Sequence, residues 1–127
     1  GMFIGSRADH VAVPGSVGLV DISGGATLNN NGWVEVGRGG TGTVNITGPG
    51  SVLNSVSGKD FQVGMDNGGV GALNITAGGV MNHNQWVDIA RGAGSKGDVL
   101  VTGAGSQLNA SLGRIVAGED GVGTLMV

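Results

Sequence analysis

The hexapeptide Gly-Thr-Val-Asn-Ile-Thr at residues 42–47 decides the fold of this chain, because the same pattern recurs along the sequence. The other copies are Gly-Leu-Val-Asp-Ile-Ser at 18–23, Gly-Ala-Leu-Asn-Ile-Thr at 71–76, Gly-Asp-Val-Leu-Val-Thr at 97–102 and Gly-Thr-Leu-Met-Val at 123–127. They start at residues 18, 42, 71, 97 and 123, so the spacings are 24, 29, 26 and 26 residues. A period in this range is typical of a solenoid, in which each repeat buries its apolar face against its neighbours.

Each copy of the motif predicts a β-strand with one apolar face. Side chains two residues apart point to the same side of a strand. The apolar positions form two columns that we expect to point inward: Val20, Val44, Leu73, Val99 and Leu125, then Ile22, Ile46, Ile75, Val101 and Val127. The positions between them, such as Asp21, Asn45 and Asn74, are expected to face outward.

A second, shorter strand follows a glycine-rich turn in each repeat, and its apolar residue leads directly into an asparagine. Asparagines in register would stack at about 4.8 Å per coil and hydrogen-bond one another through their side-chain amides. Asparagine also tolerates a left-handed corner conformation. The sequence therefore predicts a structural ladder, rather than a ligand site, formed by Asn29, Asn54, Asn82 and Asn109.

A third strand is predicted in the related segments 33–36, 61–63 and 86–89, with Val34, Phe61 and Val87 in one inward column. A fourth copy at 114–116 can be aligned in two ways, one residue apart. Residues 3–5 match the end of an earlier third strand.

These patterns predict an all-β fold: a single-stranded parallel β-helix of about four to five coils of 24–29 residues. No helical pattern intervenes, and propeller blades of about 40–50 residues do not fit the period. We expect a right-handed helix, because right-handed crossovers dominate parallel sheets. The chain is predicted to be one solenoid segment, with a tag remnant at 1–2, a partial coil with an inserted loop at 3–17, coils at 18–41, 42–70, 71–96 and 97–122, and a truncated coil at 123–127.

Composition excludes several classes of function. The net charge is −3, and the six Lys and Arg residues are scattered, whereas nucleic-acid binding needs a clustered basic surface. There is no cysteine for disulfide or thiol chemistry. No apolar run approaches the roughly 20 residues of a membrane span. His10 and His83 lie in different coils without companion ligands, so the sequence predicts no metal site and no cofactor.

The segment Gly-Thr-Val-Asn-Ile-Thr-Gly-Pro-Gly-Ser-Val-Leu-Asn at 42–54, followed by Phe-Gln-Val-Gly at 61–64, resembles the repeats of bacterial autotransporter passenger domains. Certain other secreted surface proteins of Gram-negative bacteria have the same repeat type. The resemblance covers residues 18–127. It implies a right-handed β-helix displayed outside the outer membrane, often as an adhesin or biofilm factor. It implies location and architecture rather than chemistry, and no protease or esterase motif accompanies it here.

One surface of the predicted β-helix is a candidate ligand site. If the third-strand valines point inward, Trp33 and Glu35 point outward, and Trp86 and Asp88 do so two coils away. Exposed aromatic rings beside carboxylates suit sugars, whose C–H faces stack while their hydroxyls hydrogen-bond. The alternative, which we favour, is that each tryptophan packs beneath a neighbouring loop, and the insertion at 6–17 is a natural cover.

The two acids of this surface are expected to remain solvated, as outward residues of a solenoid. Glu35 and Asp88 would lie about 10 Å apart, which slightly exceeds the separation in an inverting glycosidase. No catalytic residue is therefore predicted. Arg38 and Arg91 follow the third strand in alternate coils, with Met65 between them. They could form an anion-binding row, but the pattern is more typical of a solubilising surface.

The sequence predicts a non-enzymatic structural or adhesion segment of a secreted bacterial surface protein, located at the extracellular cell surface. Its expected partners are a host-cell or matrix surface, glycans or a second copy of itself. Unpaired strand edges at the two ends favour end-to-end association. Two alternatives stay open: a carbohydrate-binding face, and an enzyme of the polysaccharide lyase or hydrolase type, which would need a long groove with clustered acids and a basic residue. Neither nucleic acid nor membrane insertion is expected.

Overall fold

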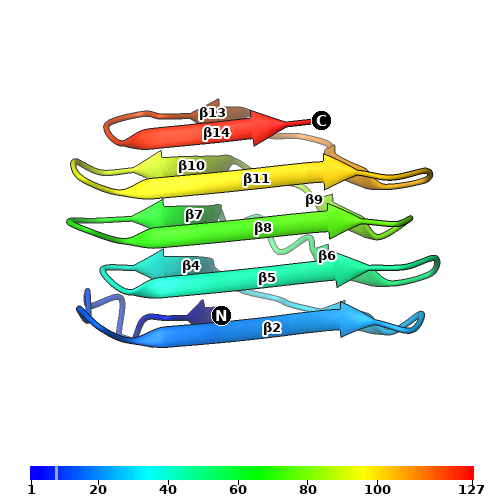
Figure 1. Cartoon of the computed structure of the whole chain (residues 1–127), viewed down its shortest axis with the longest axis horizontal. Helices are drawn as coiled ribbons and strands as arrows, with labels where there is room; N and C mark the ends of the chain where they lie inside the picture. The colour runs from blue at the N-terminus through cyan, green and yellow to red at the C-terminus, as the bar shows by residue number, and fades with distance from the viewer. Residues whose placement is uncertain (8) are drawn as a thin grey trace.

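The computed structural model describes residues 1–7 and 9–127, which form a β-solenoid of about four turns (Figure 1). Short strands joined by glycine-rich turns make up each coil. The strands are β1 (Met2–Ile4), β2 (Val17–Ser23), β3 (Thr27–Asn29), β4 (Val34–Arg38), β5 (Thr41–Thr47), β6 (Val52–Ser55), β7 (Phe61–Met65), β8 (Val70–Thr76), β9 (Val80–His83), β10 (Val87–Arg91), β11 (Lys96–Thr102), β12 (Gln107–Ala110), β13 (Ile115–Ala117) and β14 (Val122–Met126).

Equivalent strands of successive coils pair in parallel and build three sheets. Sheet A has the order β1-β4-β7-β10-β13, sheet B the order β2-β5-β8-β11-β14, and sheet C the order β3-β6-β9-β12. Figure 1 shows sheet B in front, with the shorter strands of sheet A behind it and running the other way. The predicted parallel β-helix is confirmed at this level. Within the described ranges, no helix is long and apolar enough to cross a membrane.

The core lies between the three sheets and contains most residues of the predicted apolar columns, whereas Leu125 and Val127 of the last coil are 39% and 92% exposed. Val44 pairs in register with Val20 and Leu73, and Ile46 pairs with Ile22 and Ile75. In the central coils these side chains are completely buried. Each fully buried Val, Leu or Ile contributes about 1.5–3 kcal/mol, and no single coil could supply that burial alone.

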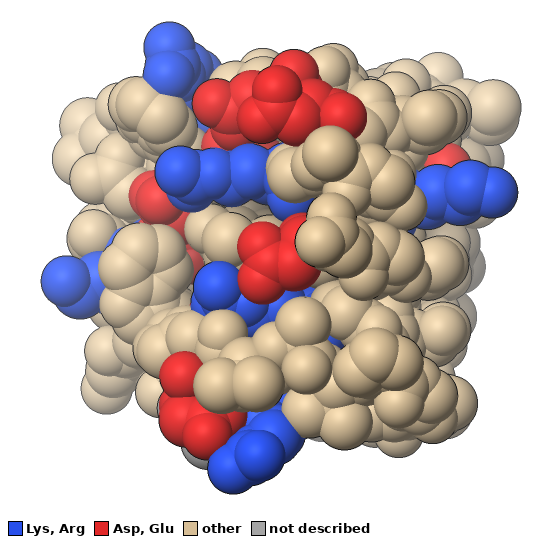
Figure 2. All heavy atoms as spheres, turned by 90° about the vertical axis from the view of Figure 1, so that its left-hand side faces the viewer, with Lys and Arg blue, Asp and Glu red and all other residues tan. Residues whose placement is uncertain are grey.

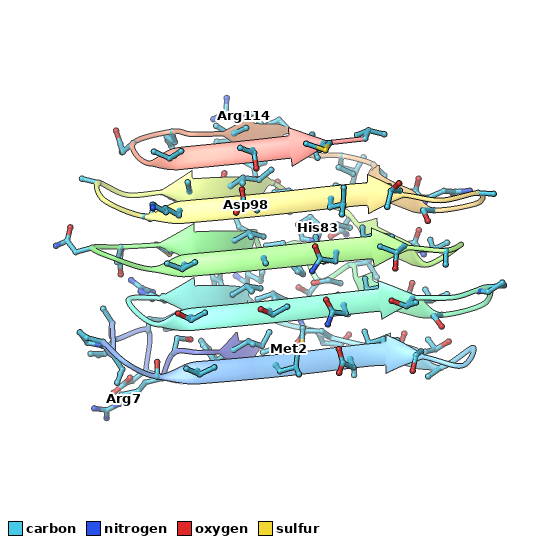
Figure 3. All side chains as sticks on the ribbon, viewed as in Figure 1. Met2, Arg7, His83, Asp98 and Arg114 are labelled. Atoms are coloured by element: carbon cyan, nitrogen blue, oxygen red, sulfur yellow. The ribbon has the colours of Figure 1, made fainter. Side chains whose placement is uncertain are left out.

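Two ladders of polar side chains run along the outside of the stack. On sheet C, each asparagine amide donates to the asparagine of the coil before it, at 2.9 Å in all three steps from Asn109 through Asn82 and Asn54 to Asn29. On sheet B, where the sequence indicated only an outward face, a second ladder is present. Its members are Asn74, Asn45 and Asp21, with donor–acceptor distances of 2.9 and 2.6 Å. Figure 3 shows the side chains that stand out on this face of sheet B.

The third strands settle the alignments that the sequence left open. Phe3 pairs with Glu35, so β1 is the third strand of a first coil, and Ile115 pairs with Val87, which selects one of the two alignments of β13. Close approach of the chain to itself explains the glycine at one corner of a coil: Gly37 has φ of 75°, and a Cβ there would lie 1.9 Å from the Val70 carbonyl oxygen. At the equivalent corner of a later coil, Ala90 adopts φ of 60°.

Candidate functional site

The outer face of sheet A carries a row of polar side chains across three neighbouring strands. Glu35 of β4 pairs with Gln62 of β7, which pairs with Asp88 of β10. The expectation that the two acids are solvated is wrong. Glu35 and Asp88 are each 1% exposed, and Gln62 is 3% exposed. Neighbouring strands lie only about 4.8 Å apart, so long side chains on this face cover one another.

The inserted segment covers the Glu35 end of the row. The sequence suggested the same segment as a cover for the neighbouring Trp33. The His10 ring packs edge-on against Phe3 and Trp33, with ring centroids 5.1 and 6.2 Å away. Its Nδ1 atom contacts a carboxylate oxygen of Glu35. Further along the segment, Ala12 lies so close to Gly39 that a Cβ on that glycine would be 2.4 Å from the alanine Cβ. The insertion therefore covers the Glu35 carboxylate and places a histidine in contact with it.

Arg38 holds the Glu35 carboxylate from the other side. Its Nη1 atom donates to Glu35 at 2.9 Å, and its Nε atom donates to Asp66 of the next coil at 2.6 Å. Burial by itself lowers the pKa of the Arg38 guanidinium, but the hydrogen bond and charge of Asp66, together with Glu35, raise it above its ordinary value. These three residues form a compact ionic network with a permanently charged centre.

A looser copy of this network lies two coils further on. Arg91 approaches Asp88 at 3.4 Å and Glu119 at 3.6 Å, and its side chain is 41% exposed. Burial raises the pKa of the Asp88 carboxyl; Arg91 opposes this rise, while the charges of Asp60 and Glu119 add to it. Figure 2 shows positive and negative side chains interleaved along this edge of the stack.

Among the residues that the structure describes, three buried oxygen atoms of the polar row have no hydrogen-bond partner: Glu35 Oε2, Gln62 Oε1 and Asp88 Oδ1. All three atoms are hydrogen-bond acceptors unless a proton is bound. They therefore cannot form hydrogen bonds with one another. Buried acceptors without a donor are uncommon in folded proteins, and each is explained by strain, by an ordered water or ion, or by a functional role.

The two tryptophans of the predicted ligand surface have different surroundings. Trp33 is partly buried, with the Lys59 Nζ atom 5.7 Å from its ring centre. Trp86 is 36% exposed, and the Arg114 guanidinium lies 3.6 Å from its ring centre. A guanidinium over an indole face occupies the surface on which a sugar would stack. The structure therefore does not present the two rings as one open platform.

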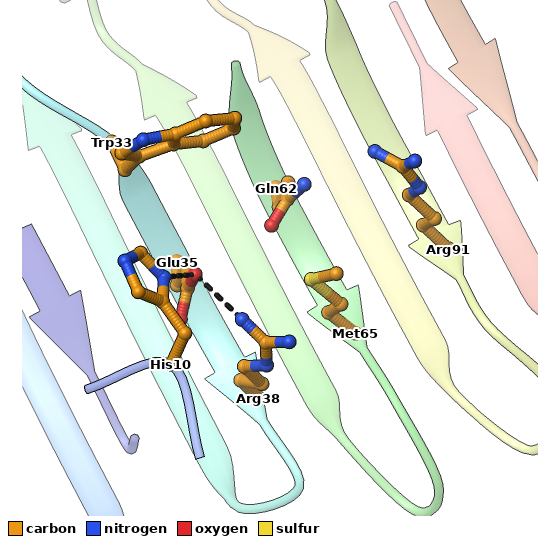
Figure 4. Close-up of a pocket in the computed structure, with 7 residues that line it drawn as sticks. All are labelled: His10, Trp33, Glu35, Arg38, Gln62, Met65 and Arg91. Carbon is orange, nitrogen blue, oxygen red and sulfur yellow. Dashed lines mark hydrogen bonds and ion pairs between the residues drawn. The ribbon is translucent and has the colours of Figure 1, made fainter. Parts of the chain in front are cut away.

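A pocket of about 310 Å³ opens beside Trp33 (Figure 4). Of the four predicted ligand residues it includes Trp33 and Glu35, while Trp86 and Asp88 are not among its lining residues. The sequence singled out the Arg38, Met65 and Arg91 row but favoured a solubilising surface, and it set His10 aside because no metal ligand accompanies it. The lining residues are His10, Trp33, Glu35, Arg38, Gln62, Met65 and Arg91.

The pocket presents charged, amide and aromatic groups, which can recognise a ligand. In the part of the chain that the structure describes, no three His, Cys, Asp or Glu side chains are placed to hold a metal ion. Comparisons with protein-family profiles, with curated proteins and with solved structures found no match to this chain.

Proposed function

We propose that this chain is a non-enzymatic structural and adhesion segment of a secreted bacterial surface protein, similar to the passenger of an autotransporter. The continuous in-register stack is the observation that carries the proposal. Pairing runs from β2 through β14 without a break in sheet B, and side-chain ladders reinforce it on two faces. Such a stack resists bending and keeps its outer positions free to vary, as a surface stalk requires.

Surface display tests this proposal. The chain would be fused to a bacterial outer-membrane carrier, and adhesion of the cells to host-cell layers and matrix would be counted. A carrier without the chain gives the background, and protease accessibility confirms display. We expect adhesion above background and no release of sugar products from polysaccharides. Display without adhesion, or turnover of a polysaccharide, would overturn the assignment.

Self-association is a further part of the proposal. Among the described strands, β2 and β14 are the outermost strands of sheet B and each pairs with one neighbour, and unpaired strand edges promote pairing with another copy. Exposed apolar side chains on these strands, such as Leu19 and Met126, support it. We expect sedimentation to show concentration-dependent growth of this polypeptide, and one monomeric species at every concentration would contradict it.

A second candidate function is carbohydrate binding at the pocket beside Trp33. The indole supplies a stacking surface, and the amide and charged groups supply hydrogen-bond partners. We expect Trp33→Ala to abolish glycan binding and Trp86→Ala, outside the pocket, to preserve it. A glycan array with no bound sugar would exclude this candidate. The lyase or hydrolase alternative has less support, because Asp88 is almost fully buried and does not line the pocket, and Arg38 and His10 already contact the Glu35 carboxylate.

A further inference from the structure

The groups around the pocket are arranged to recognise more than a generic sugar. Figure 4 shows the Trp33 indole at one end of the pocket and Met65 at the other, with the Gln62 amide between them on the floor. His10 lies on one side and Arg91 on the opposite side. A ring lying over Gln62 would contact apolar groups at both ends and polar groups at both sides.

The two arginines of the pocket differ in how firmly they are held. Arg38 makes short hydrogen bonds to two carboxylates and is 18% exposed, so its charge is already neutralised. The contacts of Arg91, at 3.4 and 3.6 Å, exceed the 2.7–2.9 Å of a strong charged hydrogen bond. Arg91 can therefore turn toward a ligand with little loss of hydrogen-bond energy, whereas Arg38 would lose two short hydrogen bonds.

The floor of the pocket can offer either a donor or an acceptor. Gln62 is nine-tenths buried or more, and its Oε1 atom has no hydrogen-bond partner in the described part of the chain. A half-turn of the terminal amide exchanges its oxygen and nitrogen. A ligand hydroxyl, which both donates and accepts, matches such a group whichever way the amide points.

The surrounding charge selects the kind of anion. Four carboxylates lie near the two guanidiniums, namely Glu35, Asp66, Asp88 and Glu119. This excess of negative charge repels a dianionic phosphate more strongly than a monoanionic carboxylate. The flat guanidinium fork of Arg91 also matches a carboxylate in two parallel hydrogen bonds.

We propose that this pocket binds a carboxylate-bearing sugar ring, a uronate, with its ring against Trp33, a hydroxyl on Gln62 and its carboxylate on Arg91. The proposal rests on the second candidate function and adds the class of sugar and the residue that selects it. Because the protein carries a net charge of −3, general electrostatic attraction would not hold such an anion.

Binding of a matched pair of probes tests the proposal: methyl β-D-glucuronoside and methyl β-D-glucoside, which differ only at C6, a carboxylate in the first and a hydroxymethyl group in the second. The Trp86→Phe variant leaves Trp33 as the single fluorescent reporter, and calorimetry on the unmodified chain provides a second readout. We expect the glucuronoside to bind about tenfold more tightly than the glucoside, as one charge-assisted hydrogen bond allows. Arg91→Gln should remove that preference.

The matched control is Lys96→Gln, which removes the same charge at the start of β11 on sheet B. It should leave the preference intact. Equal loss in both variants would overturn the proposal in favour of general charge, and tighter binding of glucose 6-phosphate would overturn the choice of carboxylate. Equal binding of the two methyl glycosides would overturn the uronate inference while carbohydrate binding stands. Binding of neither would overturn both. Because the comparison of glycosides uses the unmodified chain, misfolding of a variant would not prevent the test.

Discussion

Two stretches of this chain have the same pattern and different surroundings. Residues 33–38 read Trp-Val-Glu-Val-Gly-Arg, and residues 86–91 read Trp-Val-Asp-Ile-Ala-Arg. Both bury their single acid, and both pair their arginine with an acid of the next coil. In the first stretch His10 covers the acid and a pocket forms beside the tryptophan; in the second, Arg114 covers the tryptophan. The motif alone therefore does not define a site, and the segments that cross it do.

The largest expected difference between the two stretches is at their fifth residue. Gly37→Ala places a Cβ 1.9 Å from the Val70 carbonyl oxygen at a positive φ, so we expect a loss of about 2–4 kcal/mol in the free energy of unfolding. Ala90→Gly relieves a left-handed alanine but adds chain entropy to the unfolded state, so its change should stay within about 1 kcal/mol. Urea denaturation measures both. Equal changes in the free energy of unfolding would show that the backbone corners at Gly37 and Ala90 do not differ.

The next effect concerns the acid of the tighter network. Glu35→Gln removes the negative charge that Arg38 and His10 contact, in a position that is almost fully buried. We expect a loss of about 1–3 kcal/mol, moderated because Asp66 still pairs with Arg38. Chemical denaturation at neutral pH provides the measurement. The matched comparison is Asp88→Asn, which removes the equivalent acid of the looser network. Gln62→Glu is unsuitable because it adds a charge instead of removing one. An unchanged denaturation midpoint would mean that the ion pair makes no net contribution to the free energy of unfolding.

The corresponding change in the looser network should have the opposite sign. Because burial raises the pKa of Asp88, the folded state binds that proton more tightly than the unfolded state. The resulting stabilisation is complete below the ordinary value of 3.8 and is lost as the pH rises through the folded-state pKa. Asp88→Asn mimics the protonated carboxyl, so it should raise Tm at pH 7 and have little effect near pH 3. A lower Tm at pH 7 would show that pairing with Arg91 outweighs burial.

The smallest expected effect is on the covering of the second tryptophan. Arg114→Gln removes a cation–π contact that is worth about 0.5–1 kcal/mol at an exposed site. In a Trp33→Phe background, acrylamide should then quench Trp86 fluorescence more strongly. In a Trp86→Phe background, the same substitution should leave Trp33 quenching unchanged. Increased quenching of Trp33 would contradict the separate surroundings described above.

Much of the architecture was predictable because solenoid geometry is local. A short period and strict alternation determine which side chains face inward, so the register of Val44 and Ile46 and the ladder through Asn54 and Asn82 follow from the repeat. The sheet B ladder through Asn45 was also visible in the sequence as aligned outward amides, although its hydrogen bonds were not anticipated.

The site was predictable only in part, because it depends on segments that lie outside the repeat. Trp33 and the arginine row could be identified as candidates, but nothing in the sequence placed His10 on Glu35 or Arg114 on Trp86. The expectation of solvated acids failed for the same reason. A rule that assigns outward residues to solvent neglects the side chains of the adjacent strands and the loop that crosses them.

The sequence by itself determined the parallel β-helix, its apolar columns and its asparagine ladder, since each depends on interactions between equivalent positions of neighbouring coils. Only the tertiary structure decided which of two similar stretches carries a pocket and which arginine is available to a ligand. The physical reason is that the contacts that distinguish the two stretches, His10 with Glu35, Arg114 with Trp86 and Glu119 with Arg91, join residues that are far apart in the chain.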